Sequence, residues 1–138
     1  MKKLALLILS LFLLISCNFK ENVKENFKKK LDEYQKITDD LEIHFKHNPI
    51  GIVSGWGTDE GDNYLITTFY EYKLSTKSDS DLKSLSNSVI FRLIAKYPKF
   101  ENKDFIEVRF TSEPKSDQLK SYKSFKVDYS GTVYELEF

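Results

Sequence analysis

The chain has 138 residues, the size of one domain. Its 21 basic and 21 acidic residues give no formal net charge, which argues against nucleic acid as a main partner because proteins that bind a nucleic-acid backbone usually show a basic excess. Charged residues make up 30% and aromatic residues 14% of the chain, a composition typical of a folded domain, and the single cysteine excludes an internal disulfide.

The amino-terminal segment has the pattern of a secretion signal. Lys2 and Lys3 give it a positive start, and residues 4–15 are apolar except for Ser10. These twelve residues, if helical, reach only about 18 Å. The hydrocarbon core of a bilayer is roughly 30 Å thick. A cleaved signal peptide is therefore favoured over a spanning helix.

The segment ends in Leu14-Ile15-Ser16-Cys17, which resembles the lipobox of bacterial lipoproteins. The resemblance implies a thioether-linked diacylglycerol on Cys17 and cleavage between Ser16 and Cys17. Acylation of the new amine, for example with palmitate, would follow. Two or three acyl chains hold a protein firmly at a bilayer, whereas one chain anchors it only marginally.

The same pattern predicts the organisation and location of the chain. We expect a signal peptide at 1–16, the lipidated cysteine with a short tether at 17–22, and a single α+β domain at 23–138. Membrane lipid attached through Cys17 would hold the protein in the cell envelope. Asn18 replaces the Asp that retains enteric lipoproteins at the inner membrane, and this favours the outer membrane. Periplasmic and surface display both stay open.

A first helix is predicted from about Lys20 to about Phe45. Its apolar residues recur every three or four positions and form one stripe. The stripe consists of Val23, Phe27, Leu31, Tyr34, Ile37, Leu41 and Phe45. Residues 41–47 also alternate in polarity, so this end is either helix or strand, and Pro49 stops the helix in both cases.

A β-hairpin and a second helix follow. Strands are expected from Pro49 to Trp56 and from Tyr64 to Leu74, because both segments are rich in aromatic and β-branched residues and a polar turn separates them. The helix is predicted from about Ser80 to Tyr97, where an apolar stripe that Phe91 widens should lie on a sheet. Ser78 and Asp81 have the spacing of a capping box at its start.

Three more strands are predicted, at 104–112, 123–129 and 132–138. The last two form a hairpin around Ser130-Gly131, and a two-residue loop there sets Phe125 opposite Leu136. The element order is then α-β-β-α-β-β-β. It predicts an α+β fold in which an antiparallel sheet of about five strands carries two helices on one face.

The two histidines, His44 and His47, are weak metal candidates. They share a face if they are three residues apart on a helix, and Asp40 lies one turn before His44. No fourth ligand is identifiable, and solvated histidines at a helix end explain the pattern more simply. We therefore expect no metal site and no cofactor.

Four aromatic residues are candidate contacts for a partner or ligand. Trp56 shares its parity with Ile50 and Ile52, which favours a core position over an exposed stacking platform. Tyr64, Tyr70 and Tyr72 share one face of the predicted strand. Core packing is favoured for them, and the functional alternative is an aromatic groove.

No catalytic pattern is present in the sequence. It lacks a Gly-x-Ser-x-Gly elbow, a phosphate loop and a dinucleotide fingerprint. We therefore expect a membrane-anchored, non-catalytic module that binds an envelope protein partner. The alternative is a small-ligand-binding lipoprotein with an aromatic-lined pocket. A filled core would favour the partner, and an apolar cavity would favour the ligand.

Overall fold

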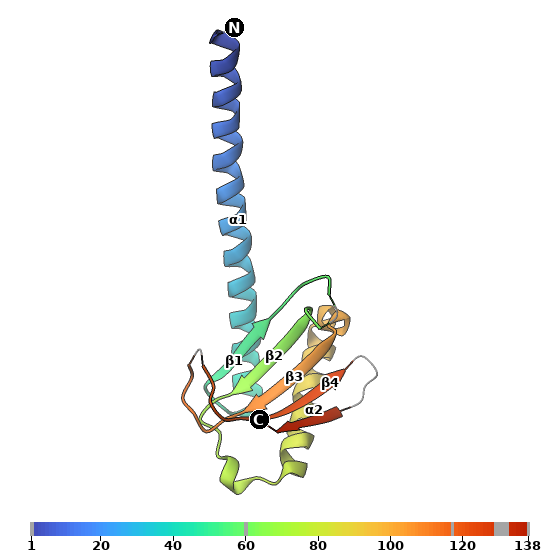
Figure 1. Cartoon of the computed structure of the whole chain (residues 1–138). Helices are drawn as coiled ribbons and strands as arrows, with labels where there is room; N and C mark the ends of the chain where they lie inside the picture. The colour runs from blue at the N-terminus through green and yellow to red at the C-terminus, as the bar shows by residue number, and fades with distance from the viewer. Residues whose placement is uncertain (1, 60, 117, 129–132, 138) are drawn as a thin grey trace. The chain divides into compact units, whose positions relative to one another are not determined.

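The computed structural model describes residues 2–59, 61–116, 118–128 and 133–137 (Figure 1). Its main elements are α1 (Lys2–Phe45), β1 (Ile50–Ser54), β2 (Tyr64–Phe69), α2 (Asp79–Lys96), β3 (Phe105–Phe110), β4 (Lys123–Asp128) and β5 (Val133–Glu137). Two short 3-10 helices, η1 (Leu74–Thr76) and η2 (Pro98–Asn102), flank α2. The predicted element order and the α+β class are confirmed.

The chain divides into two compact units, residues 1–37 and residues 38–138. From Lys2 onward the first unit is helix α1 alone, because the apolar residues of the signal segment continue directly into the helical stripe. Val23, Phe27 and Leu31 of that stripe are exposed, at 53%, 61% and 55%. A single helix offers no second element against which a stripe can be buried. In the described part of the chain, neither α1 nor α2 is long and apolar enough to cross a membrane.

The ambiguous end of α1 is helical through Phe45. Lys46 then adopts a left-handed conformation, with a φ of 51°, which is a common way to end a helix. The backbone N–H of His47 donates to the carbonyl of Glu42 over 3.2 Å and closes this end.

The second unit is built on one sheet, in which the described strands follow the order β1-β2-β3-β4-β5. All neighbouring pairs are antiparallel except β2 and β3, which are parallel. The sheet is therefore mixed, and the prediction of an antiparallel sheet is wrong at this pairing. The reason is that α2 connects β2 to β3, and a helical crossover returns the chain to the same end of the sheet.

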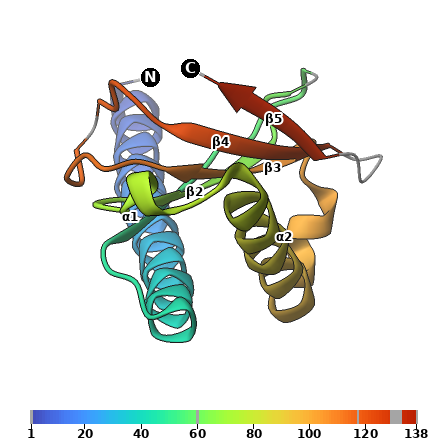
Figure 2. The same ribbon diagram turned by 90° about the horizontal axis from the view of Figure 1, so that it is seen from below.

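Within the second unit, the helical segments lie on one face of the sheet, as predicted (Figure 2). In the second unit, α2 and the last two turns of α1 cover this face, and a core of fully buried side chains fills the space beneath them. From the strands the core includes Leu65, Phe69, Val108, Phe110 and Phe125, and from the helices Leu41, Leu82, Val89 and Leu93.

Helix α2 begins with the predicted capping box. The N–H of Asp81 donates to the Ser78 hydroxyl, and the N–H of Ser78 donates to the Asp81 carboxylate, both over 3.2 Å. The prediction that Phe91 widens the buried stripe is wrong, since this side chain is 76% exposed. Phe91 follows the buried Val89 by two residues, a rotation of roughly 200° around a helix, so it lies on the opposite side.

The predicted register of the last hairpin is off by one residue. Phe125 is opposite Glu135, not Leu136, and the paired segment closes at Val127 and Val133. Register depends on the length of the turn, and a slip of one residue exchanges the two faces of a strand. The predicted loop Ser130-Gly131 lies outside the described residues.

Candidate functional site

The helix-free face of the sheet carries an open groove of about 810 Å³, which we call the sheet groove. Alternate residues of a strand point to opposite faces, so β2 directs Leu65, Thr67 and Phe69 to the helices and its other residues to this groove. The main side chains of its lining are Val53, Tyr64, Ile66, Thr68, Tyr70, Arg109, Lys120 and Tyr122.

An ion pair on β3 orients the arginine that lines the sheet groove, where Lys120 is a second lining cation. Arg109 donates from Nε and Nη2 to the two carboxylate oxygens of Glu107, over 2.7 and 2.9 Å. Glu107 is only 5% exposed, and the Arg109 guanidinium lies 4.7 Å from the ring centroid of Tyr122. Burial opposes the charge of Arg109, but the bond to Glu107, the charge of Glu107 and the electrostatic contributions of two tyrosines together outweigh it and raise the pKa of Arg109. The guanidinium is therefore charged and held in one orientation.

Two of the three candidate tyrosines meet in this groove. Tyr64 stacks on Phe105 with ring centroids 5.6 Å apart, and Tyr70 is mostly buried at the other end of the groove. The favoured prediction of core packing fits Tyr70, and the alternative of an aromatic groove fits Tyr64. Sequence reasoning missed Arg109 and Tyr122. They line the groove because β3 pairs with β2, and this pairing was not predicted.

Tyr72 does not belong to the sheet groove. Strand β2 ends at Phe69, and Glu71 has a φ of 53°, so the alternation predicted through Leu74 stops. The ring of Tyr72 packs on the helix side instead, with centroids 5.1 Å from Phe110 and 6.1 Å from Phe69. Burial there, with a contribution from Asp81, raises the pKa of Tyr72.

Trp56 lies outside both the core and the sheet groove. The prediction of a core position is wrong, because β1 ends at Ser54 and its parity does not extend to Trp56, which is 72% exposed. The preceding Gly55 is packed closely, since a Cβ at this position would lie 2.3 Å from Cε1 of Tyr64. A larger residue at position 55 would therefore force the Tyr64 ring or the Asp62 backbone to shift.

The two histidines do not share a face. Helix α1 ends between them, and His47 Nε2 donates to the carbonyl of Tyr70 over 2.6 Å while its ring packs against Phe69 and Tyr72. His44 packs edge-on against Phe45. Within the described residues, no group of three or more His, Cys, Asp or Glu side chains is arranged to hold a metal ion.

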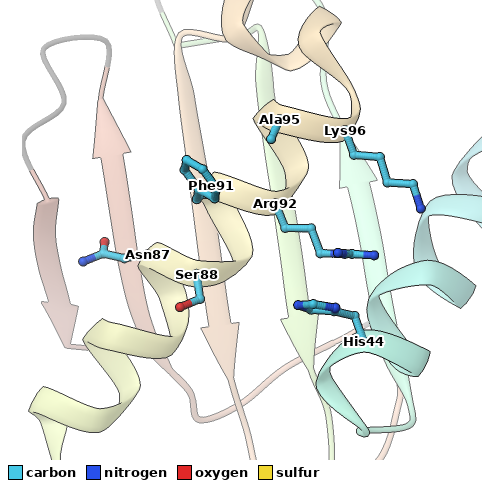
Figure 3. Close-up of a pocket in the computed structure, with 7 residues that line it drawn as sticks. All are labelled: His44, Asn87, Ser88, Phe91, Arg92, Ala95 and Lys96. Carbon is cyan, nitrogen blue, oxygen red and sulfur yellow. The ribbon is translucent and has the colours of Figure 1, made fainter.

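A second groove, of about 680 Å³, lies between the end of α1 and α2, and we call it the helix groove (Figure 3). The residues that line it are His44, Asn87, Ser88, Phe91, Arg92, Ala95 and Lys96. Sequence reasoning did not identify this groove. A large apolar residue, Phe91, on the polar side of α2 was the sequence feature that could have indicated it.

Asp40 connects the two helices beside this groove. Its carboxylate accepts hydrogen bonds from Arg92 Nε at 3.0 Å, Arg92 Nη2 at 2.7 Å and Lys96 Nζ at 2.5 Å. The bond from Arg92 lowers the pKa of Asp40, burial partly opposes this, and Lys96 adds to the lowering. The same pair raises the pKa of Arg92.

Comparison with known proteins returned no relative. No family model matches the chain, and no match was found among the curated proteins or the solved structures. The two grooves are therefore interpreted from their own chemistry.

Proposed function

We propose that this protein is a lipid-anchored lipoprotein of the cell envelope that binds a protein partner through the sheet groove and catalyses no reaction. The observation that carries the proposal is an open groove above a filled core. The described core side chains fill the space between the sheet and the helices, whereas the helix-free face of the sheet offers a concave surface. Concave surfaces of this kind accept protein segments as well as small molecules.

The lining of the sheet groove has the chemistry of a protein-binding surface. Tyrosine and arginine are the residue types most often found at the energetic centre of interfaces. Arg109 is fixed by Glu107 and by the ring of Tyr122, so little side-chain freedom is lost when a partner binds. Val53 adds an exposed apolar side chain at the rim.

Partner binding can be tested by affinity purification from membranes. Tyr64→Ser and Tyr122→Ser should each reduce recovery of the partner about 30-fold, the effect of losing an interface side chain worth about 2 kcal/mol. Trp56→Ser is the matched control, because it removes an exposed aromatic residue outside the groove. Equal recovery with all three variants would contradict the proposal.

The anchor rests on the lipobox-like order Leu14-Ile15-Ser16-Cys17. Residues 17–37, as a helix, reach at most about 30 Å, so the second unit would work within that distance of the bilayer, at the outer membrane by preference. Cys17→Ser should abolish labelling by a fatty-acid probe and release the protein from the membrane fraction. Ser16→Ala, which keeps a small residue at the cleavage position, should leave both unchanged. Labelling that persists in Cys17→Ser would exclude the anchor.

A small-molecule ligand is the second candidate for the same groove. Its volume lies within the range of ligand pockets, roughly 300–1,000 Å³, and its lining combines three tyrosines with a fixed guanidinium. Native mass spectrometry of the purified protein separates the two functions. A bound small molecule without any co-purified protein would favour the ligand.

A further inference from the structure

The helix groove carries an excess of positive charge. From Leu82 to Lys96, α2 contains Lys83, Arg92 and Lys96 and no acidic residue. Asp40 is the carboxylate that pairs with Arg92 and Lys96. Among the described residues that line the groove, Arg92 and Lys96 are charged and none is acidic, and Asp40 beside the groove balances one of these two charges.

These cations retain hydrogen-bonding capacity. A guanidinium has five N–H donors and an ammonium has three, whereas Asp40 accepts two bonds from Arg92 and one from Lys96. Their side chains are 27% and 48% exposed, so further donors reach the groove. Figure 3 shows both side chains extending toward α1, with the His44 ring beside the Arg92 guanidinium.

The other part of the same groove is apolar. Phe91 is largely exposed, and Ala95 follows it one turn later along α2. Ser88 lies one turn before Arg92 and brings a hydroxyl group to the lining. The lining therefore holds an aromatic side chain and a pair of cationic donors, which extend to opposite sides of α2 and have the exposed surface of Ser88 and Ala95 between them (Figure 3).

We propose that the helix groove binds a phosphate monoester that carries an apolar group. The phosphate lies against Arg92 and Lys96, and the apolar group packs on Phe91 and Ala95. Phosphate suits this cluster because its oxygens accept bonds from several directions, and a guanidinium can donate to two of them at once. Such a compound is either a lipid or a water-soluble ester. This site is separate from the sheet groove and does not depend on the proposed partner.

The test is an NMR titration of residues 17–138 with Cys17→Ser, which contain the whole second compact unit and carry no lipid. Phenyl phosphate should give saturable shifts at Ser88, Arg92 and Lys96, with a Kd at least ten-fold lower than that of inorganic phosphate. Lys96→Gln should weaken binding about ten-fold, because it removes a charge-assisted hydrogen bond. Phe91→Ser should erase the preference for phenyl phosphate over inorganic phosphate.

Two controls act at the other groove and elsewhere on the surface. Lys120→Gln removes a cation from the lining of the sheet groove, and Trp56→Ser removes an exposed aromatic residue, and both should leave the titration unchanged. Lysophosphatidic acid distinguishes the sources, since a Kd at least ten-fold below that of phenyl phosphate identifies a lipid and an equal Kd identifies a soluble ester. Absence of saturable shifts, or unchanged binding by Lys96→Gln, would overturn the proposal.

Discussion

On the helix-covered face of the sheet, Phe69, Phe110 and Phe125 are fully buried, whereas Tyr64 and Tyr122 on the helix-free face line an open groove. The phenylalanines form a chain of ring contacts, with Phe110 5.2 Å from Phe69 and 6.2 Å from Phe125 between centroids. Phenylalanine has no polar atom and suits a site without water, while the hydroxyl group of tyrosine suits a half-exposed one. The same sheet thus uses one face for stability and leaves the other for binding.

The largest expected difference between the two faces is in stability. Phe110→Ala should lower the free energy of unfolding by about 3–5 kcal/mol, because it opens a cavity in a filled core. Tyr122→Ala on the groove side should cost less than about 1.5 kcal/mol, since its ring is partly exposed. Urea denaturation of both variants measures the difference. Equal losses would mean that the helix-free face is also part of the core.

The ion pair in the sheet groove gives the next largest effect. Glu107→Ala should destabilise the protein by about 2–4 kcal/mol, because it leaves the partly buried guanidinium of Arg109 without its partner. Glu107→Ala combined with Arg109→Ala should cost clearly less than the sum of the single changes. A double-mutant cycle in urea measures this coupling, and strictly additive effects would contradict a structural role for the pair.

Asp40 allows a comparison with an ion pair on the helix side. Asp40→Asn should cost about 1–2 kcal/mol at neutral pH, because it weakens charge-assisted bonds that solvent partly screens. The pKa of Asp40 is lowered from its usual 3.8, so its stabilisation is fully present above that value and is lost as the pH falls below it. The difference between wild type and Asp40→Asn should therefore shrink in acid. A difference that stayed constant with pH would exclude the carboxylate as its source.

The smallest effect is expected at the start of α2. Ser78→Ala should cost about 1 kcal/mol, because it removes the hydroxyl that accepts from the N–H of Asp81. Ser80→Ala, two residues later inside the helix, should have no cost, since alanine is the better helix former. Thermal melting of the two variants tests the cap, and equal shifts would show that the hydroxyl group of Ser78 contributes nothing.

Features that depend on neighbouring residues were predictable from the sequence. The Ser78–Asp81 box needs only a four-residue pattern, and Pro49 sets a limit for α1, although the sequence left residues 41–47 open between helix and strand. The first hairpin likewise follows from two β-rich segments separated by a polar turn. These local signals were sufficient to establish the α+β class.

Features that depend on distant segments or on single backbone angles were not predictable. The parallel pairing of β2 with β3 joins segments separated by the whole of α2, and it brings Arg109 beside Thr68 in the sheet groove. Tyr72 lies two residues after Tyr70, so in a continuous strand both would face the same side of the sheet. The left-handed conformation of Glu71 between them places Tyr72 on the helix side instead. Of the main side chains that line the sheet groove, only Tyr64 and Tyr70 were candidates from the sequence, and the others needed the structure.

The central claim is that the helix-free face binds a protein partner, and photocrosslinking in living cells tests it most directly. A photoreactive residue is placed in turn at Tyr64, at Tyr122 and at Ile43, an exposed position on the helix-covered side that serves as the control. We expect one discrete crosslinked protein from each of the two groove positions and none from Ile43. Crosslinks of equal yield from all three positions, or from Ile43 alone, would contradict the claim.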